Sequence, residues 1–260
     1  TVIDKKELTM FTIGCDPEFF LEKNGKPFSA IGLIGGTKEA PKPLRKKGFA
    51  VQEDNVAVEF NVPPAQSAEE FAENIEYIMS NLKKKLRGLQ FSKASSLVFD
   101  VDQLQHPKAL EFGCEPDFNA WTKQINPRPL ASDWQLRSAG GHIHIGTKED
   151  PIEVIRAMDL FVGVPSIIKD PGGERRRELY GMPGAYRIKP FGCEYRVLSN
   201  FWIFSRELVE WVYNQTAKAI DFVESGETID PKHAAVIQEC IIKSNKDAYE
   251  FLADTYGITQ

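Results

Sequence analysis

The chain has 260 residues, with 32 Lys and Arg against 37 Asp and Glu, which gives a formal charge of −5. Hydrophobic residues make up 42% and charged residues 27%, as in ordinary soluble globular proteins. No run of about 18 apolar residues is present, so no membrane-spanning helix is predicted. The acidic balance argues against a protein that binds nucleic acid, because phosphate contacts need a basic surface.

The cellular compartment is indicated by the N-terminal residues and the cysteines. Residues 1–7 have no apolar signal core, so no export signal is predicted. The four cysteines are far apart and form no CxxC or CxxH pair, which argues against a zinc site and against a disulfide framework. We therefore expect a cytoplasmic protein whose cysteines are inert.

The predicted elements change from strands early in the chain to helices late. Strands are expected at residues 10–21, 52–62, 96–101, 135–147 and 194–198. Helices are expected after the capping box Ser67-Ala-Glu-Glu70, with an apolar stripe reaching Leu89, and at residues 151–168, 206–224, 231–244 and 246–256. Residues 171–192 are rich in Gly, Pro and Arg and are expected to form a loop. This order predicts an α+β fold in a single domain, 1–260, with a helical C-terminal part at 206–260.

Four predicted strands carry polar residues at alternate positions. Side chains at i and i+2 of a strand point to the same face. The polar residues that share a face in this way are Asp16 with Glu18; Asn55 with Glu59 and Asn61; His142 with His144; and Glu194 with Arg196. A solvated sheet face would give the same alternation, but it favours Lys, Thr and Ser over these residue types. Carboxylates suit Mg²⁺ or Mn²⁺ and His can accompany them on Mn²⁺, so the pattern predicts a metal and phosphate site.

The two histidines of the His-x-His strand also permit a different class of protein. Such pairs occur in cupin-type metal sites and in zinc hydrolases, and also as hydrogen-bonded core residues. A third histidine ligand would have to be His106 or His233, and neither has an obvious ligand context. A metal-dependent hydrolase or oxygenase built on His142 and His144 therefore stays an alternative.

A basic segment extends from the predicted loop at 171–192 into the last predicted strand. Five arginines and one lysine lie between positions 175 and 196, among glycines that let a ligand approach the backbone: Arg175, Arg176, Arg177, Arg187, Lys189 and Arg196. Guanidinium groups bind phosphate and carboxylate with two hydrogen bonds. In an acidic protein this cluster indicates a local anion site; a charged surface loop is the alternative. No P-loop sequence is present.

The combination of these motifs resembles a known family over about residues 10 to 205. The segment from Gly140 to Gly146 resembles the His-x-His strand of carboxylate–amine ligases with the glutamine-synthetase-like fold, a superfamily that includes glutamate–cysteine ligases. The segment from Tyr180 to Arg196 resembles their next conserved element. Residues 14–19 and 53–61 are most similar to the phage-type amidoligases, called COOH–NH2 ligase type 2.

This resemblance implies a curved, mainly antiparallel sheet with helices packed on its outer face. It implies ATP-dependent formation of an amide or peptide bond: ATP phosphorylates a carboxylate, and an amine displaces phosphate from the acyl phosphate. The substrates would be small-molecule or peptide carboxylates and amines, with no nucleic-acid or membrane partner, in the host cytoplasm if the chain is phage-encoded. A non-catalytic binding or structural relative is the second alternative.

The resemblance also assigns roles to residues. By motif, Glu18, Glu59, Glu194 and His142 would bind Mg²⁺ or Mn²⁺. His142, His144, Arg187 and Arg196 would contact ATP, and Arg187, Arg196 and Arg177 would stabilise the transferring phosphoryl group. Glu115 and Asp117 repeat the first acidic motif and have no assigned role.

Overall fold

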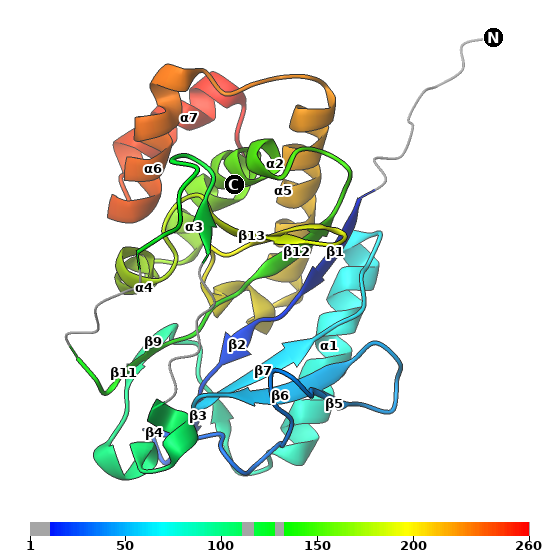
Figure 1. Ribbon diagram of the computed structural model, residues 1–260, viewed down its shortest axis with the longest axis vertical. Helices are drawn as coiled ribbons and strands as arrows, with labels where there is room; N and C mark the ends of the chain where they lie inside the picture. Colours follow the sequence, from blue (N-terminus) through cyan, green and yellow to red (C-terminus); the bar gives the residue numbers. More distant parts are fainter. Residues whose placement is uncertain (1–10, 111–116, 128–132, 260) are drawn as a thin grey trace.

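The computed structural model of the protein describes residues 11–110, 117–127 and 133–259. Within these residues the strands form four sheets, and every strand pair is antiparallel. Helices follow in the second half of the chain and gather in the upper part of the molecule behind the largest sheet (Figure 1). The predicted α+β class is therefore confirmed, while the assignment to the glutamine-synthetase-like fold stays a prediction.

The largest sheet has five strands and carries one apolar face. Its order is β1 (Thr12–Cys15), β12 (Ile143–Gly146), β14 (Gly192–Tyr195), β13 (Ala185–Lys189) and β10 (Phe118–Asn119). Ile13, Ile145 and Tyr195 are fully buried on the face that meets the helices. Those helices are α2 (Pro151–Met158), α3 (Val164–Lys169) and α5 (Arg206–Glu224), with a π-helical segment at Asp159–Gly163 joining α2 to α3.

A second sheet of four strands lies beside the first, because the chain passes from β1 into it. Its order is β2 (Glu18–Phe19), β7 (Ala57–Asn61), β6 (Ala50–Asp54) and β5 (Lys42–Pro43). Helix α1 (Ala68–Lys85) packs behind it, with the Tyr77 ring 4.7 Å from Phe49 and the Phe71 ring 5.7 Å from Trp202. The two sheets and their helices share one buried apolar core.

The remaining elements are short or lie in the C-terminal part. The smaller sheets contain β3 (Leu21–Lys23), β4 (Lys26–Phe28) and β8 (Gln90–Phe91), and β9 (Ser96–Val98) with β11 (Leu136–Ser138). The short 3₁₀ helices are Val101–Leu104, Pro107–Leu110, Asn200–Phe204 and Pro231–His233. The other α-helices are α4 (Glu174–Leu179), α6 (Ala234–Lys243) and α7 (Lys246–Tyr256).

Three of the predicted strands are broken in the structure. The expected strand at 135–147 is β11 and β12, which belong to different sheets and are separated by residues 139–142. The other two are broken for a local reason. The expected strand at 52–62 is the hairpin of β6 and β7, because Asn55 takes a left-handed conformation (φ 53°). Its side-chain amide donates to the carbonyl of Ala109 at 3.0 Å, which fixes the turn. The expected strand at 10–21 divides into β1, β2 and β3 around Pro17, which has no amide hydrogen to donate.

The predicted helices are largely confirmed. Ser67 is the N-cap of α1 and its hydroxyl accepts from the Glu70 amide at 3.1 Å, but the Glu70 carboxylate accepts from the Gln66 amide instead of closing the box on Ser67. Helices α5 and α7 have the predicted bounds. The expected helix at 151–168 is continuous but contains the π-helical segment, which no periodicity signal indicated.

The loop expected at 171–192 was wrong, because this segment contains α4 and β13. Its glycines and prolines indicated irregular structure. Arg176 and Arg177 oppose that tendency, since both side chains are buried (2% and 3% exposed) and donate to protein carbonyls. The arginines therefore order the segment as well as charge it.

Gly192 allows the close approach of β14 to β12. Its φ is +149°, and a side chain there would collide with the carbonyl oxygen of Ile145. We expect Gly192→Ala to lower the free energy of unfolding by at least about 2 kcal/mol, since strain at such a backbone position adds to the steric overlap. Urea denaturation would measure this. Gly172→Ala is the control, because nothing lies within 4 Å of its added carbon; equal losses in both variants would contradict the role of Gly192.

Candidate active site

Sheet register brings the polar residues of distant segments into rows on one face. His144 lies opposite Gly14 on one side and opposite Glu194 on the other, and Glu194 in turn lies opposite Arg187. One step along the sheet, the Asp16 amide donates to the His142 carbonyl at 3.4 Å. The alternation seen in the sequence is therefore a single polar face, whose rows join β1, β12, β14 and β13.

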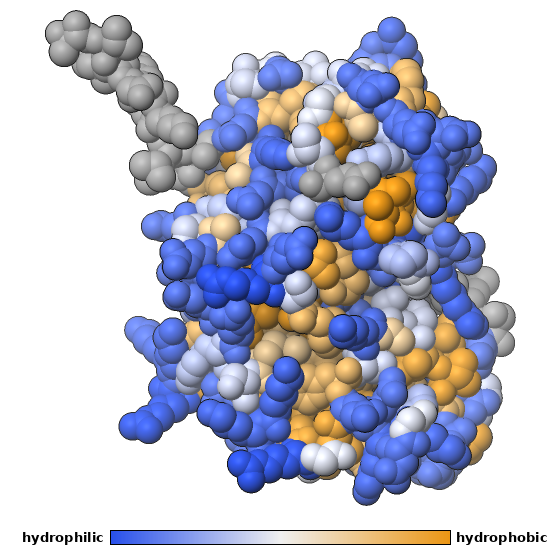
Figure 2. All heavy atoms as spheres, turned by 180° about the vertical axis from the view of Figure 1, so that it is seen from behind, coloured by the Kyte–Doolittle hydropathy of each residue, from blue (hydrophilic) through white to orange (hydrophobic). Residues whose placement is uncertain are grey.

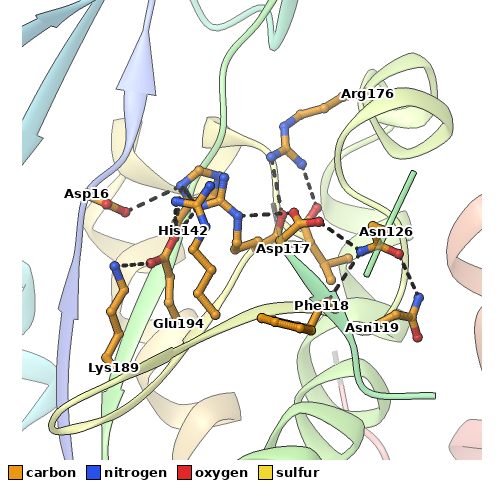
Figure 3. A network of polar contacts seen from close by, with 12 residues as sticks. Asp16, Asp117, Phe118, Asn119, Asn126, His142, Arg176, Lys189 and Glu194 are labelled. Carbon is orange, nitrogen blue, oxygen red and sulfur yellow. Dashed lines mark hydrogen bonds and ion pairs between the residues drawn. The ribbon is translucent and has the colours of Figure 1, made fainter. Parts of the chain in front are cut away.

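Glu194 is the centre of the cationic part of this face. It is fully buried, and Arg196 donates to its Oε1 atom. The Lys189 Nζ lies 2.6 Å from Oε2, and the Arg187 Nη1 lies 4.0 Å from Oε1. Figure 3 shows Glu194 between Lys189 and the His142 ring, with Asp16 next to the same ring. One buried carboxylate thus gathers three basic side chains.

These charges set the protonation of the neighbouring groups. Burial and the charge of Asp16 raise the pKa of Glu194, but Arg196, His142 and Lys189 outweigh them and hold it below its usual value. Burial and the charge of Arg196 lower the pKa of His142 to about 4, so this ring is neutral at pH 7. Burial also lowers the pKa of His144, but the charge of Asp16, 3.3 Å from its Nε2, outweighs it and raises the pKa.

Asp117 holds Arg196 from the other side. The Nε of Arg196 lies 3.3 Å from Asp117 Oδ2, and Asn126 donates to Asp117 Oδ1 at 3.1 Å. The Arg196 Nη1 is also 3.4 Å from the His142 Nδ1. Asp117, which had no assigned role, therefore positions a predicted site residue. Glu115 and Cys114 lie outside the described residues.

A second group on this side of the molecule consists of carboxylates alone. Glu18 on β2 lies directly opposite Glu59 on β7, and Asp54 joins them, with one oxygen of each within 4.8 Å of the others. Glu18 also accepts from the Gly140 amide at 3.0 Å. Among the described residues, no lysine or arginine forms an ion pair with any of the three. Like charges directly opposite one another destabilise a sheet.

The pKa values of these carboxyl groups respond to that crowding. Burial, together with the charge of Asp54, raises the pKa of Glu18 to about 8. Burial and the charges of Asp16, Glu18 and Asp54 raise the pKa of Glu59 well above its usual value. Glu18 and Glu59 therefore take up protons at neutral pH unless another cation neutralises them. Carboxylate oxygens in this number suit a hard divalent cation such as Mg²⁺ or Mn²⁺.

The structure thus divides the predicted metal ligands between two groups. Glu18 and Glu59 are together, with Asp54 as a third member. Glu194 belongs to a separate group with Asp16 and His144, whose ligand atoms also lie within 4.8 Å of one another. His142 is in neither group. Three members of these groups were not predicted as metal ligands. Asp16 and Asp54 each belong to a motif that carries a predicted ligand, and His144 was predicted to contact ATP.

The arginine cluster is divided as well. Arg177 donates to Ser244 at 2.8 Å and to the Asp170 carbonyl at 2.9 Å, and these contacts join α4 to the C-terminal helices. Arg176 instead donates to the carbonyls of Val197 and Arg196, at 2.8 and 3.3 Å, just beyond β14. We therefore assign Arg176, which the sequence analysis only counted within the cluster, as the support of Arg196.

Glycines make room for Arg176. A side chain at Gly140 would come within 2.9 Å of the Arg176 Nη2 and 2.5 Å of the His142 Nε2. One at Gly181 would collide with the Arg176 Nη1. Gly140 belongs to the His-x-His segment and Gly181 to the segment that begins at Tyr180. Both motifs therefore need glycine at these positions because Arg176 packs against them.

The remaining histidines do not complete a three-histidine zinc site. His106 is exposed and its Nδ1 accepts from the Lys108 amide at 3.2 Å. His233 contacts the Tyr256 hydroxyl at 2.7 Å. Neither contacts His142 or His144, so no observation favours the hydrolase or oxygenase alternative.

A groove of about 940 Å³ lies apart from this polar face. It is formed by α1, β8 and the start of α5, with Phe91 and Phe204 among its apolar residues, and it includes none of the residues described above. The surface seen from behind has an apolar area in the lower half of the molecule, the half in which α1 lies (Figure 2). The chemistry of the polar face, rather than the size of this groove, identifies the candidate site.

Comparison with known proteins agrees with the resemblance predicted from the motifs. Residues 129–244 match the family described as phage phiEco32-like COOH.NH2 ligase-type 2. The matched segment includes His142, His144, Arg187, Glu194 and Arg196. A search of the curated proteins found no match. None of the helices in the described residues is long and apolar enough to cross a membrane.

The raised pKa of Glu18 predicts how stability depends on pH. The folded protein keeps the Glu18 proton up to about pH 8, whereas an unfolded chain loses it near its ordinary pKa of about 4.3. The resulting stabilisation is full below the lower value and is lost as the pH rises through the higher one. We expect the free energy of unfolding, without divalent cations, to fall between pH 5 and 8 by up to about 1.4 kcal/mol per pH unit from this group.

Urea denaturation of wild type and Glu18→Gln at several pH values would isolate this contribution, because glutamine does not titrate. The slope should be flatter in the variant and unchanged in Glu73→Gln, an exposed control on α1. Identical slopes in wild type and Glu18→Gln would show that Glu18 keeps an ordinary pKa.

Proposed function

We propose that the protein is an ATP-dependent carboxylate–amine ligase that forms an amide or peptide bond through an acyl phosphate. The observation that carries this proposal is the presence of two unlike groups in neighbouring sheets, which the His-x-His segment connects through the Gly140 amide that donates to Glu18. Glu18, Asp54 and Glu59 form a group of acids with no ion pair to a lysine or arginine among the described residues, while Arg187, Lys189 and Arg196 surround a single buried carboxylate. A nucleotide triphosphate with its divalent cation has the complementary charges. The match to a family of carboxylate–amine ligases supports the same reaction class.

The donor set fits the cation that such a reaction uses. Glu18, Asp54 and Glu59 would hold one Mg²⁺ or Mn²⁺, and Asp16, His144 and Glu194 offer a second group that includes an imidazole. When bound, the cation neutralises phosphate oxygens and draws electrons from the reacting phosphorus. The three glutamates predicted from the sequence keep this role in the proposal, with Asp54 and Asp16 added.

The basic residues would bind and orient the phosphates. Arg196 is fixed by Glu194 and Asp117, so its remaining hydrogen-bonding capacity is held in place before a ligand arrives. Preorganised donors of this kind stabilise charge that develops in a transition state without reorganising. Arg187 and His144 lie on either side of Glu194 in one row of the sheet and would contact the same phosphates. We leave Arg177 out of the site because its contacts lie with Asp170 and Ser244.

The proposed chemistry needs no protein nucleophile. Phosphoryl transfer depends mainly on positioning and charge neutralisation. Cys15 and Cys193 lie next to the site in sequence but are buried, and burial raises the pKa of both thiols, that of Cys193 to about 12. They therefore remain protonated and unreactive, as the sequence indicated.

The scope of the proposal follows from the same residues. The substrates would be small-molecule or peptide carboxylates and amines. We propose that residues 1–260 act as one catalytic domain, in which the helical part at 206–260 supports the sheet. The cytoplasmic location and the absence of nucleic-acid partners stay predictions from the sequence.

A Mg-ATP assay over a panel of carboxylates and amines would test the reaction. We expect ADP and phosphate as products and loss of turnover on chelation of the metal. Arg196→Ala should lower kcat by a factor of about 10²–10³, the usual effect of removing one preorganised donor. Arg175→Ala, on the exposed side of α4, should be unchanged. Release of AMP and pyrophosphate would contradict the acyl-phosphate mechanism.

The all-carboxylate group predicts a metal affinity that depends on Asp54. We expect Asp54→Asn to weaken Mn²⁺ binding at least about tenfold, the loss that even an outer-shell partner can cause. Binding should tighten as the pH rises towards 8, since the cation displaces the proton of Glu18. Titration calorimetry would measure both effects, with Asp247→Asn, exposed on α7, as control. Equal affinities in the two variants would remove Asp54 from the metal site.

A further inference from the structure

Lys189 differs from the other cations around Glu194 in how it is held. Its Nζ lies 2.6 Å from Glu194 Oε2, and this is the only ion pair found for it among the described residues. Arg196, by comparison, is held by Glu194, Asp117 and His142 together. The Lys189 side chain is 29% exposed, while that of Glu194 is fully buried. Lys189 is thus the cation that can leave Glu194 at least cost.

The sheet register places Lys189 where it can reach a second partner. It is the last residue of β13, two positions beyond Arg187, so both side chains point to the polar face. Gly192 lies opposite it on β14, and Gly146 lies opposite Gly192 on β12, so no side chain stands beside its stem on that row. A lysine has a flexible four-carbon stem and a compact charge, which suits exchange between two anions.

The partner that Lys189 holds is itself a member of a metal-binding group. Glu194, Asp16 and His144 offer ligand atoms within 4.8 Å of one another. A lysine ammonium 2.6 Å from one of these carboxylate oxygens opposes the entry of a divalent cation, both by occupying the oxygen and by like-charge repulsion.

We propose that Lys189 is a phosphate-binding residue that neutralises Glu194 until nucleotide arrives, and then exchanges Glu194 for a phosphate oxygen. Glu194 is thereby released to the cation group that it forms with Asp16 and His144. Nucleotide and the cation at this group then bind in a linked manner, each favouring the other. This assignment rests on the proposed use of ATP, and it adds a residue and an order of binding that the motif assignments do not contain.

The test uses the full chain with Mn²⁺ and a non-hydrolysable ATP analogue as probes in titration calorimetry. In Lys189→Met we expect the analogue to bind at least about tenfold more weakly, since one charge-assisted contact is lost. We expect Mn²⁺ without nucleotide to bind more tightly than in wild type, by about tenfold, because Glu194 has lost its competing cation. Lys189→Arg should keep nucleotide binding within a few-fold, and Lys148→Met, exposed after β12, should match wild type.

The opposite signs of the two shifts separate this role from a merely structural one. Damage to the fold would weaken both ligands, and that result in Lys189→Met would overturn the proposal. Unchanged affinities in Lys189→Met, with normal binding by wild type, would overturn it and leave the proposed function standing. A wild-type protein that binds neither the analogue nor Mn²⁺ would remove both proposals.

Discussion

The organising constraint in this structure is the neutralisation of carboxylates buried on one face of the sheets. A buried carboxylate without a partner is expensive, since its charged form loses the solvation of water. The protein meets this cost in two different ways. Glu194 receives Arg196, Lys189 and Arg187, and its pKa falls. Glu18 and Glu59 form no ion pair with a basic side chain among the described residues, and their pKa values rise although the charges of Arg176 and Arg196 oppose the rise at Glu18.

The contrast is informative because both groups lie on connected strands. A protein selected only for stability would separate Glu18 from Glu59, or replace one of them, since they face each other across a strand pair. Ion pairs in the interior are weak evidence for stability, and isolated buried acids are unfavourable. Clusters of perturbed acids and bases are instead characteristic of functional sites. The arrangement is best explained by a ligand that carries positive charge to one end and negative charge to the other.

The sequence predicted the chemistry of this face better than its geometry. The i, i+2 pattern placed Glu59 and Asn61 on one face of a strand, because strand periodicity is local and needs no tertiary information. It did not apply to Asn55, which lies in the hairpin turn between β6 and β7. The division of Glu18 and Glu59 from Glu194 could not be predicted, since it depends on the register between strands far apart in the chain. The hairpin at Asn55 was missed because its left-handed turn is stabilised by the carbonyl of Ala109, 54 residues away. The sequence could not distinguish Arg176 from Arg177, because they differ only in their tertiary hydrogen bonds. Arg176 donates to carbonyls just beyond β14, and Arg177 donates to Asp170 and Ser244.

The positions of Glu194 and Arg196 are fixed from both faces of β14. On the helix side, the buried Asp159 of the π-helical segment accepts from the Tyr195 hydroxyl at 2.8 Å and from the Trp121 indole at 2.6 Å. From Trp121 a series of hydrogen bonds continues to the polar face, through Asn119, Asn126 and Asp117 to Arg196.

The hydrogen bonds form a closed loop through the backbone of β14. Tyr195, at one end of the series, is the residue between Glu194 and Arg196 in the chain. Gly163, at the end of the π-helical segment, is needed for the same contact, as a side chain there would come within 2.6 Å of the Tyr195 hydroxyl. The guanidinium of Arg196 is therefore held by bonds that begin on the opposite side of the sheet, whereas Lys189, one strand away, is held by Glu194 alone among the described residues. A rigidly held cation and a more exposed one therefore lie side by side on this face, and in the proposed exchange this difference would let Glu194 act first in an ion pair and then as a ligand.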